Sequence, residues 1–197
     1  LCHSNNDPVR EKEQILFALN HKVDGILIRP VAKGADALKD ITIPAVVIDE
    51  IDDSGISHIS INNQVAGFMA CQHLMDCGYE RIAFAGTQYA YSQQRKKGFA
   101  DALEQAGREF RPEYCWEGND RQRDGYAAME YFSALKEKPD AVFAVVDRMA
   151  YGVLHWAVDK GVKVPSELGV VGMDDLPMSA WPQFDLTTIH QSPEHMG

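Results

Sequence analysis

Short apolar runs alternate along this chain with longer segments in which apolar residues recur every three or four positions. The segment after Val146 shows the second pattern, because Ala150, Val153, Leu154 and Ala157 fall on one face of a helix. On this basis the predicted strands are 25–30, 45–49, 57–61, 81–86, 112–118, 141–146, 168–173 and 186–191, and the predicted helices are 8–21, 33–40, 62–77, 92–106, 122–137 and 147–160. Asn62 is expected to cap its helix and Gly78 to end it.

Strands that alternate with helices at this spacing predict an α/β fold with parallel sheets covered by helices. A single doubly wound sheet could hold all of these elements. The polar, acidic segment 50–56 is also a plausible crossover between two sheets.

Composition excludes several classes of protein. The 197 residues are 45% hydrophobic, and no apolar run is long enough to span a membrane. A net charge of −10, with only short basic clusters, argues against direct contact with nucleic acid. The four cysteines and seven histidines show no metal-ligand spacing, so we expect no metal, no cofactor and reduced thiols.

Three acidic residues stand where predicted strands end: Asp49, Asp147 and Asp174. Ligands of open parallel sheets bind beside these ends. Arg95 follows the strand that ends at Gly86, on the loop or first turn of the next helix. Carboxylates accept hydroxyl hydrogen bonds and a guanidinium donates to neighbouring oxygens, so this set suits a polyol.

Each of these residues also has a local interpretation. Asp147 can cap its helix, Asp49 can lie in a solvated turn, Asp174-Asp175 can cap the turn to Pro177, and Arg95 can be a surface arginine. An enzyme on a similar sheet is the other class to weigh. The chain has no nucleophile elbow, phosphate loop or dinucleotide fingerprint, so we assign no catalytic residue.

Five motifs in series carry a family resemblance. They are NNQVAGFMACQHLMDCGYERIAFAG (62–86), RKKGFADAL (95–103), PDAVFAVVDRMAYGVL (139–154), KVPSELGVVGMDD (163–175) and LTTIHQSPEHMG (186–197). Together they resemble the effector-binding core of the LacI/GalR family of bacterial transcription regulators, and the resemblance covers nearly the whole chain.

The resemblance implies two Rossmann-like lobes of the periplasmic-binding-protein type I kind, with a small effector in the cleft. Residues 1–61 are then the N-terminal lobe, to which 192–197 return, and 62–191 are the C-terminal lobe. It implies effector contacts from Arg95, Asp174, Asp49 and Gln191, with Asp147 as partly a cap and partly a pocket wall.

The chain departs from the family at Val146, where the motif commonly has asparagine. The apolar residue predicts a ligand with fewer hydroxyls in that direction, or one contacted by Arg148 instead. An aromatic residue is expected to stack on a sugar ring; sequence leaves open which of Tyr89, Tyr91, Trp116 and Trp181 does so.

The resemblance favours a cytoplasmic regulator that binds a sugar or sugar derivative, forms a homodimer and does not contact membranes. Pairing beyond the dimer is left open. Operator DNA is then contacted only through a helix-turn-helix headpiece, which is expected to lie outside this chain. The alternative is a sugar-binding transport receptor of the periplasmic type, which uses the same two-lobed fold.

Overall fold

The computed structural model describes residues 1–5, 7–31, 38, 41–48 and 55–192. Their contacts divide the chain into two compact units, one containing Leu1–Ile61 and the other formed by Asn62–Ser192. The predicted helix at 33–40, apart from Leu38, and the predicted site residue Asp49 lie outside the described residues.

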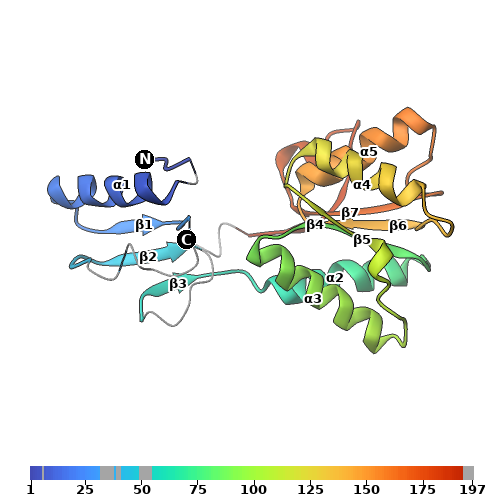
Figure 1. Ribbon diagram of the computed structural model, residues 1–197, viewed down its shortest axis with the longest axis horizontal. Coiled ribbons are helices and arrows are strands. Elements are labelled where there is room, and N and C mark those ends of the chain that lie inside the picture. Colours follow the sequence, from blue (N-terminus) through green and yellow to red (C-terminus); the bar gives the residue numbers. More distant parts are fainter. Residues whose placement is uncertain (6, 32–37, 39–40, 49–54, 193–197) are drawn as a thin grey trace. The chain divides into compact units, whose positions relative to one another are not determined.

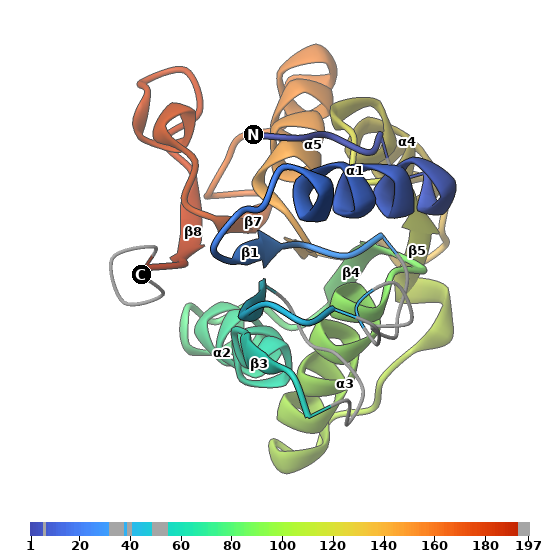
Figure 2. The same cartoon turned by 90° about the vertical axis from the view of Figure 1, so that its left-hand side faces the viewer.

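The first unit is a small parallel sheet with a helix on one face (Figures 1 and 2). Its elements are α1 (Pro8–Asn20), β1 (Ile26–Ile28), β2 (Ala45–Ile48) and β3 (Ser57–Ile59), in the sheet order β1-β2-β3. Asp7 caps α1, because its carboxylate accepts a hydrogen bond from the Val9 amide at 2.8 Å. Ile15 of α1 and Val47 of β2 are buried in the core of this unit.

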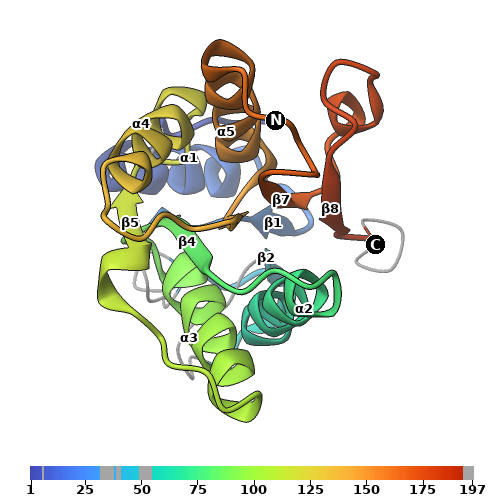
Figure 3. The ribbon, with the colours of Figure 1, turned by 90° about the vertical axis from the view of Figure 1, so that its right-hand side faces the viewer.

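The second unit is a five-stranded parallel sheet covered on both faces. Its elements are α2 (Asn63–Asp76), β4 (Ile82–Thr87), α3 (Ala90–Gln105), η2 (Pro112–Tyr114), β5 (Cys115–Gly118), α4 (Gln122–Ser133), β6 (Ala141–Ala144), α5 (Asp147–Lys160), β7 (Gly169–Asp174), η3 (Pro177–Ala180) and β8 (Thr187–His190). The strand order is β5-β4-β6-β7-β8, with α2 and α3 on one face and α4 and α5 on the other (Figures 1 and 3). The predicted class, α/β with two parallel sheets flanked by helices, is confirmed.

Burial on both faces explains why the central strands are almost wholly apolar. Every residue of β4 and β6 is buried, and Phe84 packs against Phe99 and Phe143 with ring centroids 5.6 and 5.8 Å apart. Each such side chain contributes about 1.5–3 kcal/mol through removal of apolar surface from water. This core holds the strand ends, where the candidate site lies.

Glycines let the helices of each face touch backbone to backbone. A Cβ added at Gly67 would lie 1.8 Å from the carbonyl oxygen of Arg95, and one added at Gly98 would lie 1.8 Å from a carbonyl oxygen of α2. Gly125 and Gly152 play the same part between α4 and α5. The contact between α2 and α3 brings the start of α2 close to Arg95.

Several predicted boundaries are wrong, each for a local reason. The strand predicted at 112–118 begins only at Cys115, because Pro112 opens a short 3-10 helix instead. The strand predicted at 141–146 stops at Ala144, and Val145 and Val146 form the turn into α5. Asn62 caps α2 as predicted, accepting from the Val65 amide at 3.0 Å. Within the described ranges, no helix has the length and apolar character needed to cross a bilayer.

Candidate functional site

All five strands of the second unit end at one edge of the sheet. Because the strands are parallel and paired in register, the last residues of β4 to β8 (Thr87, Gly118, Ala144, Asp174 and His190) line a common border, which we call the carboxyl edge. Open parallel sheets bind ligands at this edge. The predicted site residues of this unit are therefore considered in relation to it.

Arg95 is buried at the carboxyl edge, with only 3% of its surface exposed. Its Nε donates to Asn63 Oδ1 at 2.9 Å, and its Nη1 donates to the Val145 carbonyl oxygen at 2.5 Å. The guanidinium carbon lies 4.9 Å from the centre of the Tyr91 ring. The interpretation of Arg95 as a surface arginine is wrong, and it stands in the second turn of α3 rather than the first.

Asp174 is the last residue of β7 and is partly exposed. Its Oδ1 accepts a hydrogen bond from Gln191 Nε2 at 2.6 Å. The backbone φ of Asp174 is 128° and that of Asp175 is 54°, values that non-glycine residues rarely adopt. Such strained conformations cluster at ligand sites, where the surrounding structure holds them in place.

Asp147 is fully buried and acts as an anchor within the unit. Its carboxylate accepts from the Leu176 amide at 2.8 Å, the Ser179 hydroxyl at 2.7 Å and the Thr188 hydroxyl at 2.5 Å. It is therefore not the helix cap that sequence suggested: Val146 occupies the N-cap position of α5, and Asp147 is the first helical residue. Oδ2 holds the segment between β7 and β8, and Oδ1 holds Thr188 of β8 itself.

The remaining predicted residues flank this edge. Val146 is buried, with 8% of its surface exposed, whereas Arg148 is exposed in the first turn of α5. Gln191 is half-buried directly after β8. The structure thus brings Gln191 to Asp174, and it buries Asp147 among hydrogen-bond donors of the same unit.

Tyr91 lies in the same neighbourhood as Arg95 and Asp174. Burial raises the pKa of the Tyr91 hydroxyl above its usual value; a hydrogen bond with Thr87 and the charge of Arg95 lower the pKa, while the charges of Asp120 and Asp174 raise it. Charges of both signs therefore act on the Tyr91 hydroxyl. The Tyr91 ring also stacks on Tyr89 at 5.8 Å, and half of the surface of Tyr89 is exposed.

Asn63, Thr87 and Asp120 are three residues of this edge that sequence reasoning did not single out. Asn63 could have been noticed because it follows the cap residue Asn62 directly, at a position where a second asparagine has no capping role. Among the described residues there is no cluster of three or more histidine, cysteine or acidic side chains suited to a metal ion.

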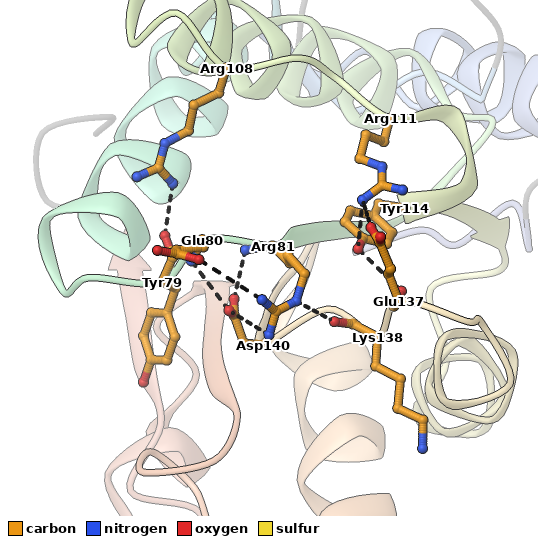
Figure 4. A network of polar contacts seen from close by, with 9 residues as sticks. All are labelled: Tyr79, Glu80, Arg81, Arg108, Arg111, Tyr114, Glu137, Lys138 and Asp140. Atoms are coloured by element: carbon orange, nitrogen blue, oxygen red, sulfur yellow. Dashed lines mark hydrogen bonds and ion pairs between the residues drawn. The ribbon is translucent and has the colours of Figure 1, made fainter.

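The opposite border of the sheet, where the strands begin, is the amino edge. It has two surface hollows of about 400 and 410 Å³, which share Arg81 in their lining. Arg81 is paired with Asp140 at 3.2 Å, and Arg111 with Glu137 at 2.6 Å (Figure 4). Both arginines thus form ion pairs with exposed or partly exposed carboxylates of the same unit.

A family model agrees with this architecture. The model for the periplasmic binding protein-like domain matches residues 71–197. This chain belongs to that family. Within the periplasmic binding protein-like family it is an effector-binding core of the LacI/GalR type, as the resemblance in its motifs predicted.

Curated relatives of this periplasmic binding protein-like chain are transcriptional repressors. The HTH-type transcriptional repressor PurR of Mannheimia succiniciproducens is 32% identical over 204 residues, covering 100% of this chain and 61% of the relative. The PurR repressor of Haemophilus influenzae (strain PittEE) is 31% identical over 203 residues, covering 100% of this chain and 60% of the relative. The chain thus spans less than two thirds of the length of these relatives.

Solved structures show the same fold. The transcription regulator CcpA of Lactococcus lactis superposes with a TM-score of 0.87 at 27% identity, covering 100% of this chain and 74% of CcpA. A sugar-binding transcriptional regulator of the LacI family from Escherichia coli, complexed with phosphate, gives 0.86 at 23% identity, covering 96% of this chain and 70% of that one. The second likeness shows the fold alone.

Proposed function

We propose that this domain senses a small, sugar-like effector at the carboxyl edge of its five-stranded sheet. The observation that carries the proposal is the pair of charged side chains there, Arg95 buried in α3 and Asp174 on strained backbone at the end of β7. The Arg95 guanidinium lies 4.9 Å from the centre of the Tyr91 ring, and the charge of Asp174 also acts on the Tyr91 hydroxyl. Asp49, from the first unit, is proposed as a further contact.

The chemistry of these groups favours a neutral ligand rich in hydroxyl groups. A carboxylate accepts two or more hydroxyl hydrogen bonds, and a guanidinium donates to neighbouring oxygens. Asp174, Asp175 and Asp120 together repel an anion, and Arg95 and Arg148 offset this repulsion only in part. The exposed ring of Tyr89 offers a face on which the C–H groups of a sugar ring can pack.

The relatives supply the regulatory part of the proposal. They are named as transcriptional repressors, not enzymes, and we propose that this domain likewise controls DNA binding by an HTH-type headpiece. Effector can shift the protein between two arrangements only if it binds one of them more tightly. A cytoplasmic homodimer with two-fold symmetry would match an operator built of two half-sites.

The test starts from a thermal-shift screen with D-ribose, D-glucose, D-galactose, adenosine and uridine. A ligand at 100 times its Kd adds about 2.7 kcal/mol of stability, which raises Tm measurably. The compound with the largest effect is then titrated calorimetrically into the unaltered chain and into Asp174→Ala. We expect Asp174→Ala to weaken binding by about 2–4 kcal/mol, because it removes a charge-assisted contact.

Glu80→Ala is the matched control, since it removes an exposed carboxylate from the amino edge. Its affinity for the compound should equal that of the unaltered chain. Equal affinities for Asp174→Ala and the unaltered chain would contradict the assignment, and a screen without any thermal shift would contradict the ligand class.

A further inference from the structure

Two hydrogen bonds connect the candidate site to residues beside the two ends of the second unit. The unit is Asn62–Ser192, so Asn63 is its second residue and Gln191 its last but one. Asn63 accepts a hydrogen bond from Arg95, and Gln191 donates one to Asp174. We infer that Asn63 and Gln191 are positioning residues that set these two charged side chains for the ligand; the inference rests on the proposed function.

Asn63 is buried, with 3% of its surface exposed, and uses both ends of its amide. Its Oδ1 accepts from Arg95 Nε at 2.9 Å, and its Nδ2 donates to Gln94 Oε1 at 3.0 Å. An asparagine at the first position of a helix needs neither bond for capping, because Asn62 already caps α2. The side chain of Asn63 therefore bonds to two residues of α3, and one of these bonds orients the Arg95 guanidinium.

Gln191 reaches Asp174 because of the strand register. β7 and β8 pair Asp174 with His190, so the residue after His190 lies beside the carboxylate. Gln191 Nε2 donates to Asp174 Oδ1 at 2.6 Å. Sequence motifs suggested that Gln191 contacts the effector directly; its bond to Asp174 assigns it to the carboxylate instead.

The two links have the same consequence at opposite ends of the unit. A ligand that draws Arg95 toward itself weakens or strengthens its hydrogen bond with Asn63, near the start of the unit. A ligand that draws Asp174 toward itself does the same to the hydrogen bond with Gln191, near the end of the unit. Ligand binding can thus favour one conformation of these segments over another, which is the differential affinity that regulation requires.

The first experiment needs no ligand. In a ¹⁵N-labelled sample, solvent exchange of the Arg95 Nε–H is measured by NMR in the unaltered chain, Asn63→Ala and Asn63→Asp. We expect exchange about tenfold faster in Asn63→Ala, which lacks the acceptor, and near-normal exchange in Asn63→Asp, which keeps one. Gln72→Ala is the control, because Gln72 donates to Asp76 on the outer side of the same helix. Unchanged exchange in Asn63→Ala would overturn the role of Asn63.

The second experiment is a double-mutant cycle on Gln191 and Asp174. The probe is the sugar or nucleoside that gives the largest thermal shift in the screen described above. Gln191→Ala should weaken its binding about tenfold. In the Asp174→Ala background the same change should add nothing, because a positioning residue acts only through its partner. Additive losses would mean that Gln191 contacts the ligand itself and would overturn the inference.

The two experiments separate the failure of this inference from the failure of the proposed function. If no compound in the screen shifts Tm, the proposed ligand class fails, while the exchange of the Arg95 Nε–H still decides whether Asn63 positions that side chain. If a compound binds and Gln191→Ala leaves its affinity unchanged, positioning by Gln191 fails and the proposed function stands. Gln191 is half-buried next to the end of the unit, so we expect this variant to fold.

Discussion

The two edges of the five-stranded sheet differ in how deeply their arginines are buried. At the carboxyl edge, Arg95 and Asp147 are buried and bonded to backbone groups, amides and hydroxyls. At the amino edge, Arg81 pairs with Asp140 while their side chains keep 44% and 23% of their surface exposed, and Arg111 pairs with Glu137 in the same manner (Figure 4).

This difference indicates which edge is functional. Exposed ion pairs contribute about 0–1 kcal/mol and are common on any protein surface. Burial of a charge costs several kcal/mol unless hydrogen bonds offset it, and an apolar side chain of similar size is often as stable. Asp147 anchors the unit, but Arg95 is buried at the same edge as the strained backbone of Asp174, and we propose ligand binding as the reason for this pair.

The largest effect is expected where a buried charge is removed. Asp147→Ala leaves the Leu176 amide and two hydroxyls without their acceptor, so we expect the free energy of unfolding to fall by about 3 kcal/mol. Urea denaturation measures this loss. Asp159→Ala, at the exposed end of the same helix, should change stability by less than about 0.5 kcal/mol. Equal small losses in both variants would contradict the anchoring role.

Hydrophobic periodicity was sufficient to predict most strands and helices and the α/β class, whereas the two lobes followed from the family resemblance and most contacts at the site were beyond both. The strands and helices follow local spacing, which sequence displays directly. The role of Asp147 depends on partners 29 to 41 residues away, and the bond between Asn63 and Arg95 joins residues 32 apart. Arg95 resembles its neighbours Lys96 and Lys97 in sequence, and the close contact of α2 with α3, the Tyr91 ring and Val145 together bury it.

A smaller effect is expected at the amino edge. Arg81→Met removes an exposed ion pair and should lower the free energy of unfolding by about 0.5 kcal/mol, a loss that shrinks in high salt. The variant should bind the effector like the unaltered chain, because Arg81 lies at the far edge of the sheet. Urea denaturation at low and high salt, together with a binding titration, checks both points. A loss of affinity in Arg81→Met would indicate that the effector binds at the amino edge, which would contradict the proposed site.

The smallest effect concerns Glu117, at the end of β5. Its pKa lies below its usual value: partial burial opposes the shift, but hydrogen bonds from Gln93 and Lys96 outweigh it. The stabilisation is therefore present above about pH 4.3, the unfolded value, and is lost as pH falls through the lowered pKa. Glu117→Gln removes a contribution below about 0.5 kcal/mol, so its stability should decline less steeply in acid.

Urea denaturation between roughly pH 3 and pH 7 compares Glu117→Gln with the unaltered chain. Glu113→Gln provides a comparison for Glu117→Gln at an exposed carboxylate. The pKa of Glu113 is also lowered, by its own backbone amide and by Arg111. An acid decline as steep in Glu117→Gln as in the unaltered chain would show that the pair with Lys96 does not stabilise the carboxyl edge.

The most direct measurement is a map of backbone amide shifts during titration with the sugar or nucleoside that raises Tm most. We expect the perturbed amides of the second unit to concentrate at the carboxyl edge, in Thr87–Arg95, Val145–Arg148 and Asp174–Leu176. Perturbations concentrated instead in Glu80–Ile82 and Arg108–Tyr114, beside the amino-edge hollow, would contradict the proposed site.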